Sequence, residues 1–135
     1  MATDVNQYLG NPNLKKANVP VEFTKEQIQE YQKCMDDPVY FIQEYMKIVS
    51  LDEGLVPFKM YDFQKTMVNT FHDNRFTICK LPRQSGKSTT IIAYLLHFVL
   101  FNPNVNVAIL ANKSSTARDI LGRLQLGYEH LPKWL

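Results

Sequence analysis

The chain has 135 residues, of which 45% are hydrophobic and 21% charged, and its formal net charge is +2. This length suits one globular domain and is too short for two, and so small a charge does not by itself indicate nucleic-acid binding. The sequence has neither the paired cysteine motifs of metal and redox sites nor an apolar run near the roughly 18 residues of a membrane span, so we expect a soluble protein that is not exported.

The N-terminal segment is polar and contains Gly10, Pro12 and Pro20 without a sustained hydrophobic period. Such a composition does not bury enough apolar surface to offset the entropy of ordering the chain. We therefore expect a flexible arm over residues 1–23, ahead of a folded part over residues 24–135.

Two short helices are expected next. Thr24 and Gln27 have the S/T-x-x-E/Q spacing of a capping box, which predicts a helix from there to about Met35. Asp37-Pro38 then places a capping carboxylate before a proline at the first position of a second helix. Apolar residues at helical spacing follow, so both helices are interpreted as packing scaffold.

A strand and a further helix lead to a candidate base-binding residue. Ile48-Val49 indicates a short strand over residues 47–51, a turn follows at 52–54, and a helix is expected to end near residue 72. Near the start of that helix lies Gln64, whose amide donates and accepts at once and so suits the edge of an adenine ring. The alternative is an ordinary surface glutamine. Aromatic neighbours that would line the base pocket are Phe58, Tyr61 and Phe63.

The clearest pattern runs from residue 75 to residue 101. A β-prone run over 75–81 is followed by a polar turn that ends in Gly86-Lys87-Ser88, and then by an apolar helical run to Phe101. Strand, loop and helix in this order form the setting of a phosphate-binding loop. The helix is apolar on most sides, which predicts burial against a parallel sheet, with His97 in a structural role.

Each residue type in the turn has a chemical reason. Gly86 allows the backbone to approach a phosphate closely, and the start of the helix adds unpaired N–H groups and the positive end of its dipole. Lys87 is placed to reach the β- and γ-phosphates, and the hydroxyl of Ser88 suits Mg²⁺. The G-x-x-x-x-G-K-[ST] pattern also asks for a glycine at the position of Leu81. The alternative is a simple strand–helix turn with a solvated lysine.

Arg83 is a residue that an ordinary phosphate cradle does not require. It precedes Gly86 by three positions, and a guanidinium pairs with phosphate oxygens through two parallel hydrogen bonds. We interpret Arg83 as an arginine finger supplied by the same chain, which raises phosphoryl-transfer rates by about 10³–10⁵-fold in enzymes that use one. A solvated loop arginine is the alternative.

After the helix, Asn102-Pro103-Asn104 predicts a break, and residues 105–111 predict a second strand parallel to the first. The polar residues 111–115 would then lie at the carboxyl edge of the sheet, where ligand sites of α/β proteins collect. They resemble helicase motif Ia, although a capped loop before the next helix is an equal alternative. That last helix is expected over about residues 116–128.

The run Leu81-Pro82-Arg83-Gln84-Ser85-Gly86-Lys87-Ser88-Thr89 resembles the deviant Walker A loop of the large terminase subunits of tailed bacteriophages, especially the myovirus type. That loop also lacks the first glycine. The resemblance extends to Tyr61-Asp62-Phe63-Gln64, to residues 109–113 and to the closing residues 128–135. It thus covers most of the chain from about residue 38.

The resemblance implies the ATP-driven motor that moves viral double-stranded DNA into a preformed capsid. The implied fold is α/β, a P-loop NTPase of the ASCE or RecA-like type with a parallel sheet flanked by helices, incomplete in this chain. The implied ligands are ATP and Mg²⁺, with Arg83 and Lys87 as catalytic residues and Ser88 on the metal. Implied partners are DNA, the portal protein and the small terminase subunit, in the cytoplasm of the bacterial host cell. The residues implied to bind ATP are Gln64, Arg83, Gln84, Ser85, Gly86, Lys87, Ser88 and Thr89.

ATP hydrolysis in this class also needs an apolar strand that ends in Asp-Glu, and no acidic pair in this sequence follows such a strand. We therefore expect an amino-terminal piece of a large terminase, or a natural truncation of one. Such a chain would hydrolyse ATP hardly at all and would form an oligomer or a complex. Two alternatives stay open: a helicase-type P-loop translocase, and a non-catalytic fragment that binds nucleotide or another protein.

Overall fold

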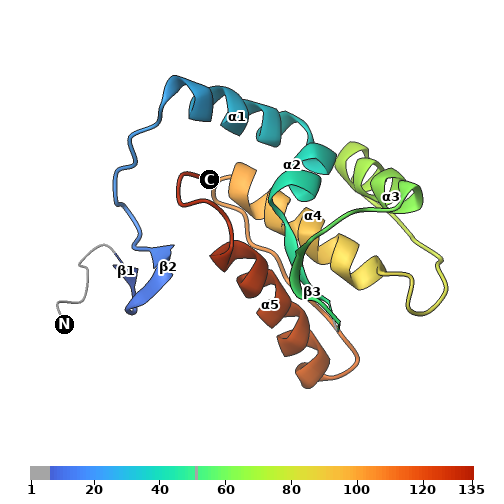
Figure 1. Cartoon of the computed structure of the whole chain (residues 1–135). Helices are drawn as coiled ribbons and strands as arrows, with labels where there is room; N and C mark the ends of the chain where they lie inside the picture. Colours follow the sequence, from blue (N-terminus) through green and yellow to red (C-terminus); the bar gives the residue numbers. More distant parts are fainter. Residues whose placement is uncertain (1–6, 51) are drawn as a thin grey trace.

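The computed structural model describes residues 7–50 and 52–135, and this part of the chain is α/β, with five helices and two small sheets (Figure 1). None of the described helices is long and apolar enough to cross a membrane. Both sheets are antiparallel and two-stranded, β1 with β2 and β3 with β4. The elements are β1 (Gln7–Tyr8), β2 (Asn11–Lys15), α1 (Lys25–Asp36), α2 (Pro38–Tyr45), β3 (Lys47–Ser50), β4 (Gly54–Pro57), α3 (Asp62–Asp73), α4 (Lys87–Phe101) and α5 (Ser114–Glu129).

The first two helices begin where the sequence predicts, because the expected caps are formed. The hydroxyl of Thr24 accepts from the backbone N–H of Gln27 at 3.2 Å, and the Gln27 side chain accepts from the backbone N–H of Thr24 at 2.9 Å. Asp37 Oδ1 accepts from the backbone N–H of Tyr40 at 2.9 Å, with Pro38 at the first position of α2. The capping box and the Asp-Pro boundary between the helices are therefore confirmed.

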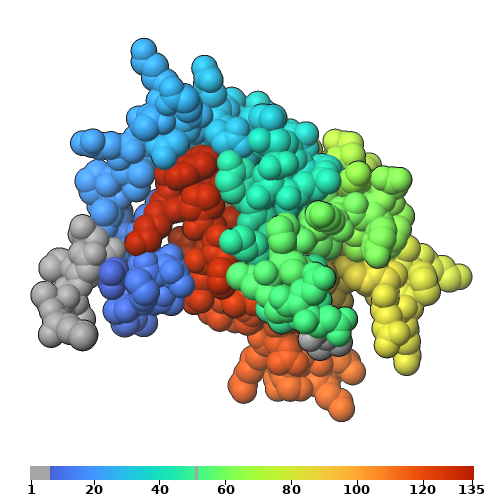
Figure 2. Space-filling model, viewed as in Figure 1, coloured from blue at the N-terminus to red at the C-terminus, as the bar shows by residue number. Residues whose placement is uncertain are grey.

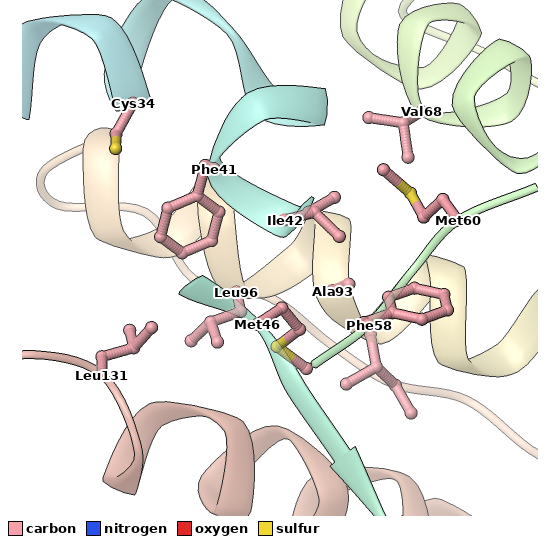
Figure 3. Packing of buried hydrophobic residues seen from close by; sticks show 11 residues of the cluster. Cys34, Phe41, Ile42, Met46, Phe58, Met60, Val68, Ala93, Leu96 and Leu131 are labelled. Carbon is pink, nitrogen blue, oxygen red and sulfur yellow. The ribbon is translucent and has the colours of Figure 1, made fainter. Parts of the chain in front are cut away.

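The core surrounds α4, which packs against α2, α3 and α5 (Figure 1). Buried side chains of α4, among them Ala93 and Leu96, join Phe41 and Ile42 of α2 in one cluster (Figure 3). Burying an apolar side chain of Ile or Phe size is worth about 1.5–3 kcal/mol, so this cluster holds α4 firmly in place. The loop that precedes α4 is thereby attached to a rigid element.

His97 belongs to this core, as its predicted structural role requires. It is 2% exposed, and its Nε2 lies 2.9 Å from the backbone carbonyl oxygen of Cys34 in α1. A carbonyl only accepts, so Nε2 carries the proton and donates it. The bond ties α4 to α1 across the core.

Residues 7–15 form a hairpin where the sequence predicts a flexible arm. At its turn, Leu9 and Gly10 both have positive φ, 51° and 76°, which is the geometry of a two-residue hairpin loop. Asn11 Nδ2 donates to Glu129 Oε1 at 3.2 Å, and Lys15 Nζ donates to the carbonyl oxygen of Lys133 at 3.1 Å. The hairpin thus lies beside the C-terminal end of α5, as Figure 2 also shows.

The two predicted parallel strands are not formed in the described part of the chain. Residues 75–81 and 105–111 are irregular, and no parallel pairing is present among the described residues. A strand is defined by hydrogen bonds to a neighbour, and neither segment is paired with a strand in the described part of the chain. Apolar side chains expected to be buried in the sheet are consequently exposed: the exposed fraction is 83% for Phe76, 99% for Ile78 and 89% for Leu110. The predicted P-loop parallel sheet is therefore not shown by these two segments, and Figure 2 shows the first of them protruding at the edge of the molecule.

Candidate functional site

The predicted phosphate-binding loop leads directly into α4. Gly86 is the N-cap of that helix and has φ 73° and ψ 12°, a left-handed conformation that favours glycine. Its carbonyl oxygen accepts from both the backbone N–H and the hydroxyl of Thr90, at 3.0 Å each. None of the described side chains caps the N-terminus of α4. The first N–H groups of this buried helix are thus free to bind an anion.

The loop is also folded on itself. Pro82 offers its carbonyl oxygen to two donors, Ser85 Oγ and Lys87 Nζ, each at 3.0 Å. Gln84, which lies between Pro82 and Ser85 in sequence, has a positive φ of 60°, which is uncommon for a residue with a side chain. Left-handed residues at 84 and 86 turn the backbone sharply, and successive N–H groups in such a turn can form a concave nest for an anion.

Gln64 lies against this loop from the first turn of α3. The side chain is 2% exposed, and its Oε1 accepts from the backbone N–H of Tyr61 at 2.9 Å. Its Nε2 donates to the carbonyl oxygen of Ser85 at 3.5 Å, a long hydrogen bond. An atom at the Cβ position of Gly86 would be only 2.6 Å from Nε2. The alternative of an ordinary surface glutamine is therefore wrong.

A cavity of about 650 Å³ opens between the loop and the β3–β4 hairpin. The loop and the start of α4 line it with Gln84, Ser85, Gly86 and Thr89, and Gln64 lines it from α3. Stacked rings of Tyr61 and Phe63, with centroids 5.9 Å apart and planes 10° from parallel, also line it. The size is that of a small-molecule site, typically about 300–1,000 Å³. The hairpin contributes Ile48, Glu53, Val56 and Pro57.

Three predicted site residues lie outside this cavity. Lys87 lines a second cavity, of about 430 Å³, together with Arg75 and Cys79. Arg83 and Ser88 are exposed, and neither side chain makes a hydrogen bond or an ion pair with a described residue. The structure thus joins Gln64 and the loop backbone, and it leaves Arg83 and Ser88 open to solvent.

Two further expectations concern metal binding and residues 111–115. Among the described residues there is no cluster of His, Cys, Asp or Glu that could hold a metal ion. Residues 111–115 are exposed at the start of α5, and in this part of the chain no hydrogen bond joins them to the phosphate-binding loop. Their predicted place at a sheet edge beside the loop depends on a sheet that is not formed here.

Sequence reasoning missed β4 and its contribution to the cavity. The signal was present, because the turn at 52–54 is flanked by Ile48-Val49 on one side and Leu55-Val56 on the other. β3 and β4 pair in register from Lys47 opposite Pro57 to Ser50 opposite Gly54. Gly54 has φ 72°, which suits the end of the turn.

A comparison with protein families matches residues 78–133 of the chain to the N-terminal part of the terminase large subunit of T4likevirus type. The matched segment contains the whole loop, α4 and α5, and it confirms the resemblance that the loop motif predicts. Over these residues the chain is similar to the N-terminal part of the T4likevirus-type large terminase subunit.

Proposed function

We propose that this chain is the ATP-binding part of a large terminase subunit that packages viral DNA. The observation that carries the proposal is the loop itself. Gly86 is the N-cap residue of α4, has a left-handed conformation and supplies no side-chain cap. Lys87 follows it, and both lie in the segment that matches the terminase family. A helix start with free N–H groups and an adjacent lysine favours a polyphosphate.

The residues present fit ATP and Mg²⁺. In the proposed arrangement the N–H groups of the first turn of α4 and the ammonium of Lys87 hold the β- and γ-phosphates, and the hydroxyl of Ser88 ligates Mg²⁺. Arg83, exposed on the same loop, pairs with the γ-phosphate. Gln84, Ser85 and Thr89 form the remaining wall of the site. The cavity beside Gln64, with the stacked Tyr61 and Phe63, accommodates the base.

The larger function that we propose is that of the matched family. ATP hydrolysis in such a motor drives movement of double-stranded DNA, in the host-cell cytoplasm, with the portal protein and the small terminase subunit as partners. The matched family favours this reading over a helicase-type translocase. A second candidate, protein binding without catalysis, is favoured by the exposed apolar side chains of Phe76, Ile78 and Leu110.

Calorimetric titration of the chain with ATP in the presence of Mg²⁺ tests the proposal. We expect saturable binding to one site and an increase in the melting temperature with ligand concentration, because a ligand that binds only the folded state stabilises it. AMP, which lacks the β- and γ-phosphates, should bind much more weakly. An absence of saturable ATP binding up to millimolar concentrations would contradict the proposal.

A further inference from the structure

Gln64 connects two structures that both bear on the proposed site, the start of α3 and the phosphate-binding loop. Its acceptor, Oε1, is used by the backbone N–H of Tyr61, and its donor, Nε2, faces the carbonyl oxygen of Ser85. The side chain is almost fully buried, so these backbone groups replace water as its partners. A buried amide held at both ends is constrained in orientation.

The hydrogen bond to the carbonyl oxygen of Ser85 constrains the orientation of the whole peptide group between Ser85 and Gly86. The carbonyl of Ser85 and the N–H of Gly86 belong to the same planar, trans peptide, in which they point in opposite directions. Since the carbonyl faces Gln64, the N–H of Gly86 points away from Gln64. Gln64 therefore sets the direction of a backbone donor in the middle of the loop.

Gly86 is fitted to this contact in two ways. Its φ of 73° favours glycine, and a Cβ would lie 2.6 Å from the amide nitrogen of Gln64, closer than real Cβ atoms come to a neighbour. Gly54 has nearly the same φ, 72°, but nothing lies within 4 Å of its Cβ position. A comparison of alanine substitutions at the two glycines therefore distinguishes the effect of the positive φ, which both have, from the effect of the contact with Gln64, which only Gly86 has.

We propose that Gln64 is a positioning residue for the phosphate-binding loop, which holds the Ser85–Gly86 peptide in the orientation that presents the Gly86 N–H to a polyphosphate. The proposal rests on the proposed ATP-binding function and assigns the effect of Gln64 to the phosphate end of the ligand. The bonds to Tyr61 and Ser85 occupy one lone pair of Oε1 and one N–H of Nε2, so recognition of an adenine edge by the remaining lone pair and N–H is the competing role that the binding experiments separate.

Two substitutions separate these roles. Gln64→Glu keeps an acceptor for the Tyr61 N–H, as in an ordinary capping box, but removes the donor that faces Ser85. Gln64→Met keeps the length of the side chain and adds no charge, so it controls for repulsion between a carboxylate and the ligand. Melting temperatures of both variants show whether each is folded before its binding is measured.

The probes are Mg²⁺-ATP, Mg²⁺-GTP and inorganic tripolyphosphate with Mg²⁺, titrated calorimetrically into the wild-type chain and both variants. A positioning residue acts on the binding of the triphosphate. Within each variant, the affinities for all three ligands should therefore fall by the same factor, about three- to tenfold for one hydrogen bond. The ratio of ATP to GTP affinity should not change. A loss confined to ATP, with tripolyphosphate binding unchanged, would overturn the proposal and make Gln64 an adenine reader.

A second measurement needs no ligand. Gly86→Ala should destabilise the fold more than Gly54→Ala, and the excess should disappear when Gln64→Ala is added, because the clash then has no partner. An excess that persists without the Gln64 side chain would overturn the contact on which the proposal stands. Failure of the wild-type chain to bind either ATP or tripolyphosphate would instead refute the proposed function, and the positioning role with it.

Discussion

Lys87 donates a hydrogen bond from its ammonium group to the carbonyl oxygen of Pro82, at 3.0 Å, so the proposed phosphate-binding cation is held by its own loop. A polyphosphate competes with one neutral carbonyl for this cation, and a charge-assisted bond is the stronger of the two. We expect Lys87→Ala to lower ATP affinity by about ten- to a hundredfold, the equivalent of about 1.5–3 kcal/mol. Titration calorimetry measures the change.

The fold should survive that substitution, because the lost bond is exposed and the core around α4 does not include Lys87. Lys80→Ala is the matched control, since Lys80 is an exposed lysine of the preceding segment and its removal changes the net charge equally. In a large terminase that hydrolyses ATP, the same substitution at the matching lysine should abolish ATPase activity. Undiminished steady-state hydrolysis in that variant would refute the assignment of the loop.

Arg83 should behave differently from Lys87. Its guanidinium is exposed and has no partner among the described residues, so Arg83→Ala should leave the melting temperature unchanged. If Arg83 acts on charge that develops at the γ-phosphate, the variant of a hydrolysing terminase should lose kcat by orders of magnitude with little change in nucleotide affinity. Comparison of steady-state kinetics with calorimetric affinities decides this. A loss restricted to affinity would make Arg83 an ordinary phosphate contact.

The isolated chain should associate and should not turn over ATP. Exposed Phe76, Ile78 and Leu110 favour burial against another surface, and the sequence offers no Asp-Glu strand for the metal and the attacking water. Light scattering should give a mass above that of one chain, and ATPase activity should equal the background. The double variant Phe76→Ser, Ile78→Ser should shift the mass toward a monomer. A monomeric wild-type chain that hydrolyses ATP at ordinary enzyme rates would contradict both expectations.

Two glycines of α5 should respond oppositely to alanine. A Cβ at Gly127 would lie 2.8 Å from Met46 Cε and 3.2 Å from Leu96 Cδ2, whereas nothing lies within 4 Å of the Cβ position of Gly122. Gly127→Ala should destabilise the fold, by about 1–3 kcal/mol for overpacking less the gain in helix propensity. Gly122→Ala should stabilise it by about 0.5–1 kcal/mol. Urea denaturation measures both, and equal effects would contradict the packing of α5 on α4.

The buried His97 should make stability depend on pH. Burial lowers the pKa of His97, and the hydrogen bond to Cys34 opposes this shift only in part. The unfolded chain takes up a proton near its ordinary pKa of about 6.5, and the folded chain takes it up only at lower pH, so stability is lost as the pH falls below about 6.5. Between pH 7.5 and 5.5 the loss should be measurable, with an upper bound of about 1.4 kcal/mol for a histidine that stays neutral in the folded state.

Urea midpoints at the two pH values measure this loss. His97→Phe serves as the comparison, because it fills the aromatic site without a titrating group. The variant should be less stable at pH 7.5, where the Cys34 carbonyl loses its buried donor, and its stability should vary less with pH. An equal pH dependence in the two proteins would assign the effect to other groups.

The sequence by itself determined the local features of this protein. Thr24 and Gln27, Asp37 and Pro38, and the Gly86-Lys87 junction each fix a helix start, because a cap or a left-handed glycine acts on neighbours within one turn. The loop motif likewise predicted a resemblance to large terminase subunits, and residues 78–133 match the N-terminal part of that family.

The tertiary structure alone decided the contacts between distant segments. The segments 75–81 and 105–111 have strand-like sequences, but a strand forms only where a partner supplies hydrogen bonds, and neither segment has such a partner among the described residues. Asn11 is hydrogen-bonded to Glu129, and Gln64 to Ser85, and no periodic pattern in the sequence predicts contacts between residues so far apart. Such pairings depend on how the helices pack around α4, because packing brings their partners within hydrogen-bonding distance.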